Sequence, residues 1–88
     1  MVIKELQVLN KLGFHARVAS RITRSVSEFQ SSVNVKKDGR SYDLKSVTGV
    51  IMANAKQGDV LTIEIQGPDE ESAAEALSAL FAEKFGES

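Results

Sequence analysis

The dipeptide Asp38-Gly39 is the feature that most constrains the fold, because it stands between two short β-prone runs. Both central residues of a two-residue type I′ turn need positive φ angles, and Asp-Gly is one of the pairs that adopt them readily. We therefore expect a β-hairpin with strands at about residues 33–37 and 40–44. The hairpin favours an antiparallel sheet.

Two further runs show the period of two that is typical of strands. In VLTIEI (residues 60–65), Leu61, Ile63 and Ile65 share one side, which predicts a half-buried strand. The run VIKELQVL (residues 2–9) is also β-rich, although its alternation is imperfect. Its residues on one side are Val2, Lys4, Leu6 and Val8.

The period changes to that of an amphipathic helix from Ala16. A short second helix is expected after Ser46, whose hydroxyl can cap free amides, and Asn54 suits a left-handed C-cap. A third helix begins after Asp69, which is expected to be its N-cap, and the tail GES (residues 86–88) is expected to fray. The apolar faces are Val18, Ala19, Ile22, Val26 and Phe29 in the first helix, and Ala73, Leu77, Leu80 and Phe81 in the third.

The expected order is β-α-β-β-α-β-α, which predicts an α+β fold with a four-stranded antiparallel sheet and three helices on one face. A chain of 88 residues has no room for a second core, so residues 1–88 are expected to form one domain. The sequence contains no cysteine, which excludes a disulfide framework and a thiolate metal site. The start MVIKELQVLN lacks the apolar run of a signal peptide, and no stretch is long enough to span a bilayer. We expect a cytoplasmic protein without membrane insertion.

Charge is divided unevenly between the two halves of the chain, although the net charge is only −1. Residues 1–40 contain eight Lys and Arg against three Asp and Glu, whereas residues 41–88 contain three against nine. A near-neutral total argues against bulk attraction to nucleic acid. The basic half can still form a local patch for an anionic partner.

The only histidine, His15, lies in GFHAR (residues 13–17), at or just before the start of the first helix. Amides at a helix start have no internal partner, and the helix dipole makes that end a suitable phosphate site. Neutral imidazole is nucleophilic at physiological pH, so a phosphoryl group could be taken onto the ring, with Arg17 as a nearby fixed charge. The alternative is a surface or capping histidine. A metal site is not expected, because no second histidine or cysteine is present.

Two other features allow a structural or a functional interpretation. Arg17, Arg21 and Arg24 are spaced i, i+4, i+7 and form a basic stripe, which is either a solvated face or a docking surface for an acidic protein. Ser46 is either a plain helix cap or a position where a phosphate would be electrostatically favourable and would alter the surface.

The segments NKLGFHAR (10–17), LKSVTGV (44–50) and QGD (57–59), in this order, resemble HPr, the histidine-containing phosphocarrier family of the bacterial sugar phosphotransferase system. The resemblance covers nearly the whole chain, and the family fold, an open-faced β-sandwich, agrees with the expected element order. It implies that His15 accepts a phosphoryl group from phospho-Enzyme I and passes it to the A component of a sugar permease. Arg17 and the backbone amides of Ala16 and Arg17 would steady that group.

The resemblance also implies that Ser46 is a regulatory serine, with an HPr kinase/phosphorylase and a transcriptional regulator as further partners. It implies a monomeric, stoichiometric carrier that needs no cofactor and is not an enzyme. The docking residues implied beside the site are Arg21, Arg24, Val47, Ile51 and Met52.

This chain departs from the usual family pattern at three positions. Val18 replaces a proline and leaves an extra amide in the first helical turn. Thr48 stands where an apolar residue is common, and Asn54 stands where glycine is usual. Three alternatives stay open: a regulatory paralogue that works through Ser46, a nitrogen-type paralogue, and a split βαβ nucleic-acid-binding domain. The last would use exposed strand aromatics, of which the strands offer only Tyr42.

Overall fold

The computed structural model describes residues 1–87 and confirms the predicted order of strands and helices. A final short 3₁₀ turn, η1 (Lys84–Gly86), is added after the last helix. The strands are β1 (Val2–Gln7), β2 (Ser32–Lys37), β3 (Arg40–Asp43) and β4 (Val60–Gln66). The helices are α1 (Ala16–Val26), α2 (Val47–Ala53) and α3 (Glu70–Ala82).

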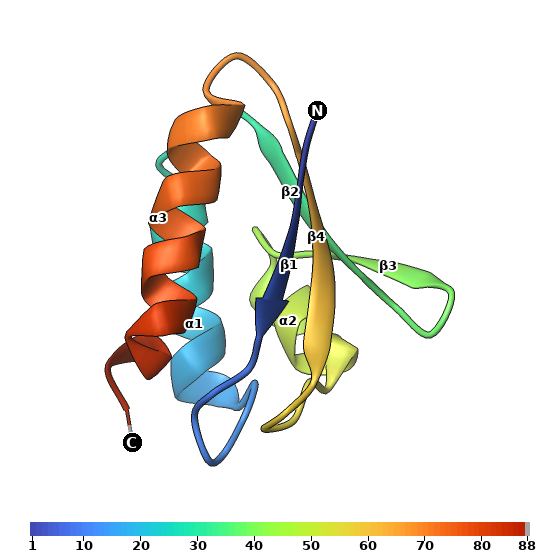
Figure 1. The fold of residues 1–88 in the computed structure, drawn as a ribbon, viewed down its shortest axis with the longest axis vertical. Coiled ribbons are helices and arrows are strands. Elements are labelled where there is room, and N and C mark those ends of the chain that lie inside the picture. Colours follow the sequence, from blue (N-terminus) through green and yellow to red (C-terminus); the bar gives the residue numbers. More distant parts are fainter. Residues whose placement is uncertain (88) are drawn as a thin grey trace.

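The four strands form one antiparallel sheet in the order β1-β4-β2-β3. Helices α1 and α3 lie side by side on one face of the sheet, and α2 lies toward its lower end (Figure 1). The predicted fold class is therefore confirmed. The hairpin prediction is confirmed as well, because Asp38 and Gly39 have φ angles of 53° and 77°, as a type I′ turn requires.

The hydrophobic core fills the space between the sheet and the helices. Its centre is β4, where Leu61, Ile63 and Ile65 are buried, as the alternating pattern predicts. The matching stripe on α1 is Val18, Ala19, Ile22 and Val26, all fully buried. Phe29 lies beyond the end of α1 and is only half-buried, so the helix is one turn shorter than the apolar spacing indicated.

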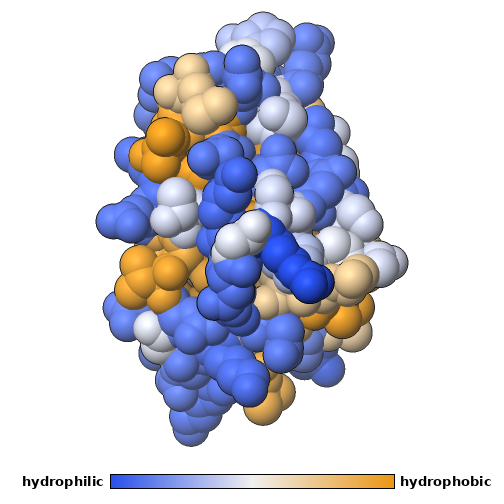
Figure 2. All heavy atoms as spheres, turned by 90° about the vertical axis from the view of Figure 1, so that its right-hand side faces the viewer, coloured by the Kyte–Doolittle hydropathy of each residue, from blue (hydrophilic) through white to orange (hydrophobic). Residues whose placement is uncertain are grey.

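Within residues 1–87, no helix covers the opposite face of the sheet. Figure 2 views the molecule from this side and shows it as mostly hydrophilic, with apolar areas that are separated from one another. Glu5, Thr62 and Lys36 lie in one row across β1, β4 and β2. None of the helices in residues 1–87 has the length and apolar character needed to cross a membrane.

Both predicted caps of α2 are confirmed. Ser46 Oγ accepts a hydrogen bond from the Gly49 amide at 3.1 Å, and Asn54 has left-handed angles of φ 50° and ψ 43°. For α3, Asp69 occupies the N-cap position, but its side chain does not cap the helix as we expected. It accepts instead from the Gln30 amide, the Ser31 amide and the Ser31 hydroxyl at 2.9, 2.9 and 2.5 Å. A carboxylate satisfies several donors at once, so tertiary hydrogen bonds displaced the local cap.

The chain end is anchored by an aromatic cluster of Phe14, Phe81 and Phe85. The three rings meet edge to face, with centroids 4.8–6.0 Å apart. Phe85 is fully buried, and the Arg21 guanidinium donates to its carbonyl oxygen. The expectation of a frayed tail is thus wrong for Gly86 and Glu87, because burial of an aromatic ring offsets the entropy lost on ordering the chain. Ser88 lies outside the described residues.

We predict that Phe81→Ala lowers the free energy of unfolding by about 3–5 kcal/mol, because it removes one of the three mutually packed rings of the aromatic cluster and leaves a cavity. Denaturant unfolding measures this loss. The control is Leu80→Ala, which truncates the half-buried neighbour on the same helix and should cost clearly less. If Phe81→Ala and Leu80→Ala lost equal free energy of unfolding, the aromatic cluster would contribute no more stability than an ordinary half-buried leucine.

A second prediction concerns pH. The Ser31 hydroxyl, followed by the Gln30 amide, holds the pKa of Asp69 below its ordinary value of 3.8. A lowered pKa in the folded state stabilises the fold above 3.8, and this stabilisation is lost as the pH falls through the folded-state pKa. Asp69→Ala should therefore lower the thermal midpoint at neutral pH, and its difference from the wild type should shrink in strong acid. Glu71→Ala, at an exposed neighbouring position, is the control and should show no such convergence.

Candidate functional site

His15 is the N-cap residue of α1. Its backbone is extended, with φ −96° and ψ −180°, and its Nδ1 atom accepts a hydrogen bond from the Arg17 amide at 3.3 Å. The predicted position is thus confirmed, and so is the capping interpretation. Because the ring caps through Nδ1, the lone pair of that nitrogen is directed at the first turn of the helix.

The loop before His15 is held against the end of α2. The Phe14 amide donates to the Ala55 carbonyl at 2.9 Å. Gly13 has a φ of 64°, and a Cβ atom at this position would collide with the same carbonyl. Glycine is therefore required here both for its backbone conformation and for the close approach. This tight turn at Gly13 sets the entry of the chain into α1.

The second ring nitrogen of His15 contacts the tail. Nε2 lies 2.8 Å from Oε1 of Glu87, and Asn10 Nδ2 donates to the same oxygen at 3.2 Å. Asn10 is fully buried and also donates to the Gly13 carbonyl at 2.9 Å. No periodicity or residue spacing in the sequence marks Asn10 or Glu87 as part of the site. No local pattern could have found Glu87, because 72 positions separate it from His15.

The two hydrogen bonds to the Glu87 carboxylate, from His15 and from Asn10, influence its ionisation. The hydrogen bond with His15, followed by that from Asn10, holds the pKa of Glu87 below its ordinary value of 4.5, against the opposing effect of desolvation. The charge of Arg17 acts in the same direction. Glu87 is therefore a carboxylate at neutral pH, and a carboxylate is only an acceptor of hydrogen bonds.

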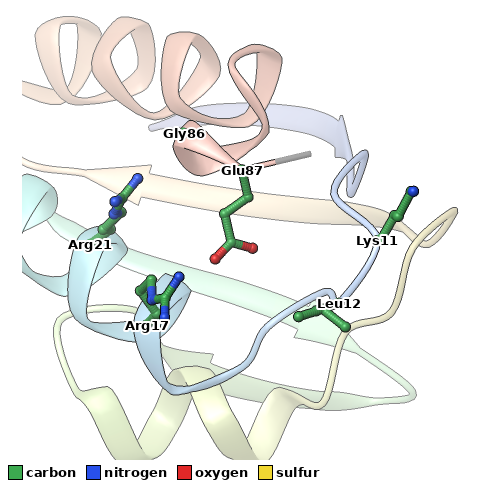
Figure 3. A pocket seen from close by; sticks show the side chains of 6 residues that line it. All are labelled: Lys11, Leu12, Arg17, Arg21, Gly86 and Glu87. Carbon is green, nitrogen blue, oxygen red and sulfur yellow. The ribbon is translucent and has the colours of Figure 1, made fainter.

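A hollow of about 460 Å³ opens beside this contact. Figure 3 shows the Glu87 carboxylate reaching from the tail toward the start of α1, with Arg17 and Arg21 on one side and Leu12 on the other. The described part of the chain gives no partner to the amides of Ala16 and Val18, so the first turn of α1 offers donors for an anion. The lining residues are Lys11, Leu12, Arg17, Arg21, Gly86 and Glu87.

The three arginines of the predicted stripe have different surroundings. Arg17 is exposed at the hollow, whereas the guanidinium of Arg21 holds the Phe85 carbonyl and so has a structural use. Arg24 lies in the last turn of α1, roughly 10 Å along the helix axis from Arg17 at 1.5 Å per residue. The structure therefore joins Arg17 and Arg21 at one hollow and leaves Arg24 apart.

The apolar residues predicted for docking are exposed on α2, with Val47, Ile51 and Met52 at 40%, 45% and 62%. Leu12 is more exposed, at 74%, and was missed although it lies three residues before His15. A single exposed leucine is ordinary on a protein surface, so Leu12 carries no sequence signal without the surface around it.

Ser46 lies at the end of α2 that is remote from His15. The adjoining Leu44 carbonyl accepts from Thr23 Oγ1 at 3.3 Å, which places the start of α2 beside the C-terminal half of α1. The other end of α2 leads to Ala55, which contacts the loop before His15. Within residues 1–87, no group of three or more His, Cys, Asp and Glu side chains could hold a metal ion.

Comparison with known proteins places this geometry in a family. Residues 2–83 match the family described as "PTS HPr component phosphorylation site". Phosphocarrier protein HPr of Cupriavidus necator is 42% identical over 99% of this chain and 98% of its own length. Phosphocarrier protein NPr of Proteus mirabilis is 35% identical over 96% and 94%.

The fold comparison agrees with the sequence comparison. The crystal structure of HPr-C-His from Thermoanaerobacter tengcongensis covers 100% of this chain and 99% of its own, with 36% identity and a TM-score of 0.94. The nucleic-acid-binding alternative therefore falls away, and the chain belongs to the HPr family of phosphocarriers of the phosphotransferase system.

Proposed function

We propose that His15 is the residue that carries the phosphoryl group, accepting it from phospho-Enzyme I and passing it to the A component of a sugar permease. The observation that carries this proposal is the position of Nδ1, whose lone pair faces the first turn of α1. A phosphoryl group bonded to Nδ1 would take over the Arg17 amide and reach the amide of Ala16. The guanidinium of Arg17 can then neutralise part of its charge.

The surface around His15 supports docking of an acidic protein with an apolar centre. Leu12 supplies exposed apolar area at the hollow, and Ile51 and Met52 supply it on α2, whereas Lys11 and Arg17 supply positive charge at the hollow. Charge complementarity raises the rate of encounter, whereas buried apolar contacts slow dissociation. Val47 and Arg24 extend this surface toward Ser46. We expect the protein to act as a monomer, as a carrier that is regenerated rather than as an enzyme, and in the cytoplasm.

Ser46 is proposed as a regulatory site for an HPr kinase/phosphorylase. Its Oγ acts only as an acceptor in the fold, from the Gly49 amide, so its proton is not engaged in a described hydrogen bond. A phosphate at this position would face the free amides of the α2 start, which favours the anion. Because Ser46 is remote from His15, the phosphate would act on a partner that covers both ends of α2. A transcriptional regulator is a further candidate partner for that form.

Incubation with Enzyme I and phosphoenolpyruvate should add one phosphate to the protein, labile in acid and stable in base, as expected for a phosphoramidate. His15→Ala should accept none, since the chain has no other histidine. Intact mass measures both. Labelling of the variant would show that the site assignment is wrong. A nitrogen-type pathway would use the same ring, and comparing the Enzyme I proteins of the two pathways as donors separates them.

Ser46→Asp should slow phosphoryl transfer from Enzyme I while leaving the thermal midpoint unchanged or slightly raised. The reason is that a negative charge at a helix start contributes roughly 0.3–1 kcal/mol of stability, whereas the same charge repels an acidic partner. The effect should be smaller than that of a phosphate, which carries about −1.5 to −2 charges. Ser72→Asp, in the exposed first turn of α3, is the matched control and should leave transfer unchanged. If the transfer rate of Ser46→Asp equalled that of the wild type, Ser46 would have no role beyond capping α2.

A further inference from the structure

Glu87 is the one ionised group that contacts the side chain of His15 in the described residues, and nothing in its sequence neighbourhood points to a role. Its position relative to the two ring nitrogens decides what it can do. Oε1 lies 2.8 Å from Nε2, while Nδ1 is bonded to the Arg17 amide on the other side of the ring. Glu87 therefore does not occupy the place of a phosphoryl group on Nδ1.

Two independent hydrogen bonds settle which nitrogen carries the proton. The Glu87 carboxylate can only accept, so Nε2 must be the donor in that contact. On the other side the Arg17 amide can only donate, so Nδ1 must be the acceptor. Both contacts select the neutral ring with its proton on Nε2 and its lone pair on Nδ1.

The carboxylate is itself held in place. Asn10 is fully buried and donates Nδ2 both to Glu87 Oε1 and to the Gly13 carbonyl. Because both of these partners are acceptors, the orientation of the Asn10 amide is determined by the contacts themselves. Phe85, two residues before Glu87, is fixed in the aromatic cluster, and the Arg21 guanidinium binds its carbonyl. The tail thus presents Glu87 to the ring from an ordered support.

We infer that Glu87 is a positioning residue for phosphoryl transfer, which orients the His15 ring through Nε2 and keeps Nδ1 as the nucleophile. This inference rests on the proposed function. In the transfer step the Nδ1 lone pair forms the new N–P bond, and the bond from phosphorus to the donor atom breaks with its electron pair remaining on the donor. Nε2 keeps its proton throughout. The product ring is a phosphoimidazolium whose positive charge faces the Glu87 carboxylate.

The experiment compares four proteins: the wild type, Glu87→Ala, Glu87→Gln and Glu83→Ala. Glutamine keeps a carbonyl oxygen that can accept from both Nε2 and Asn10 but lacks the charge. Glu83→Ala removes the same charge from an exposed position close to the tail, and Glu83 makes no described side-chain contact with His15. Thermal melts of all four establish that each one is folded.

The first readout is the NMR resonance of the ring proton on Nε2, which a hydrogen bond protects from exchange with water. It should be visible in the wild type, Glu87→Gln and Glu83→Ala, and lost in Glu87→Ala.

The second readout is the rate of phosphoryl acceptance from Enzyme I. Outer partners that orient histidine rings at metal sites change activity by about 10–100-fold, so we expect a loss of about tenfold in Glu87→Ala, with Glu87→Gln closer to the wild type.

The outcomes separate this inference from the proposed function. An unchanged ring-proton resonance in Glu87→Ala, or a transfer rate equal to that of Glu83→Ala, overturns the positioning role. Faster transfer in Glu87→Ala also overturns it, because Glu87 would then be an obstacle to the donor. If no variant and no wild-type protein accepts phosphate, the proposed function fails, while the ring-proton readout still tests whether Glu87 orients His15.

Discussion

The edge-to-face packing of Phe14, Phe81 and Phe85 is the contact on which the geometry of the site depends. Phe14 directly precedes His15, and Phe85 lies two residues before Glu87, so one aromatic cluster sets the positions of two polar groups that are far apart in the sequence. Aromatic rings bury large areas and prefer specific mutual angles, which makes them suited to fixing backbone segments relative to one another. The distance between His15 and Glu87 is therefore determined in the core rather than on the surface.

A small fold without a deep pocket can still hold a reactive ring in a defined state. His15 is bonded at Nδ1 to the backbone of its own helix and at Nε2 to the tail, and both bonds require the same tautomer, with the proton on Nε2. The first bond lies at the phosphate site that we propose at the start of α1, and the second is the contact that we infer to orient the ring. Because neither bond covers the Nδ1 side with a side chain, a partner protein can supply the remaining walls of the reaction site.

The placement of α2 separates the two proposed phosphorylation sites, His15 and Ser46. Its last turn leads to Ala55, which lies against the loop that carries His15, whereas its N-cap, Ser46, lies beside the other half of α1. The exposed apolar residues of α2 lie between these ends, and they include Ile51 and Met52. A charge at Ser46 is thus best placed to act on whatever protein covers α2, with little effect on the chemistry of the ring.

The sequence alone determined the strands, the helices and the capping position of His15, because these depend on local rules of periodicity, turn conformation and unpaired helix amides. Asp38-Gly39, Ser46 and Asn54 behave as their residue types predict. Asp69 does not, since its carboxylate found donors at residues 30 and 31, and the tail does not fray, since Phe85 enters the core. The contacts of His15 with Glu87, of Asn10 with Glu87 and of Arg21 with the Phe85 carbonyl exist only in the folded chain. They join positions that no sequence period relates, and only the closing of the core brings their polar atoms within hydrogen-bonding distance.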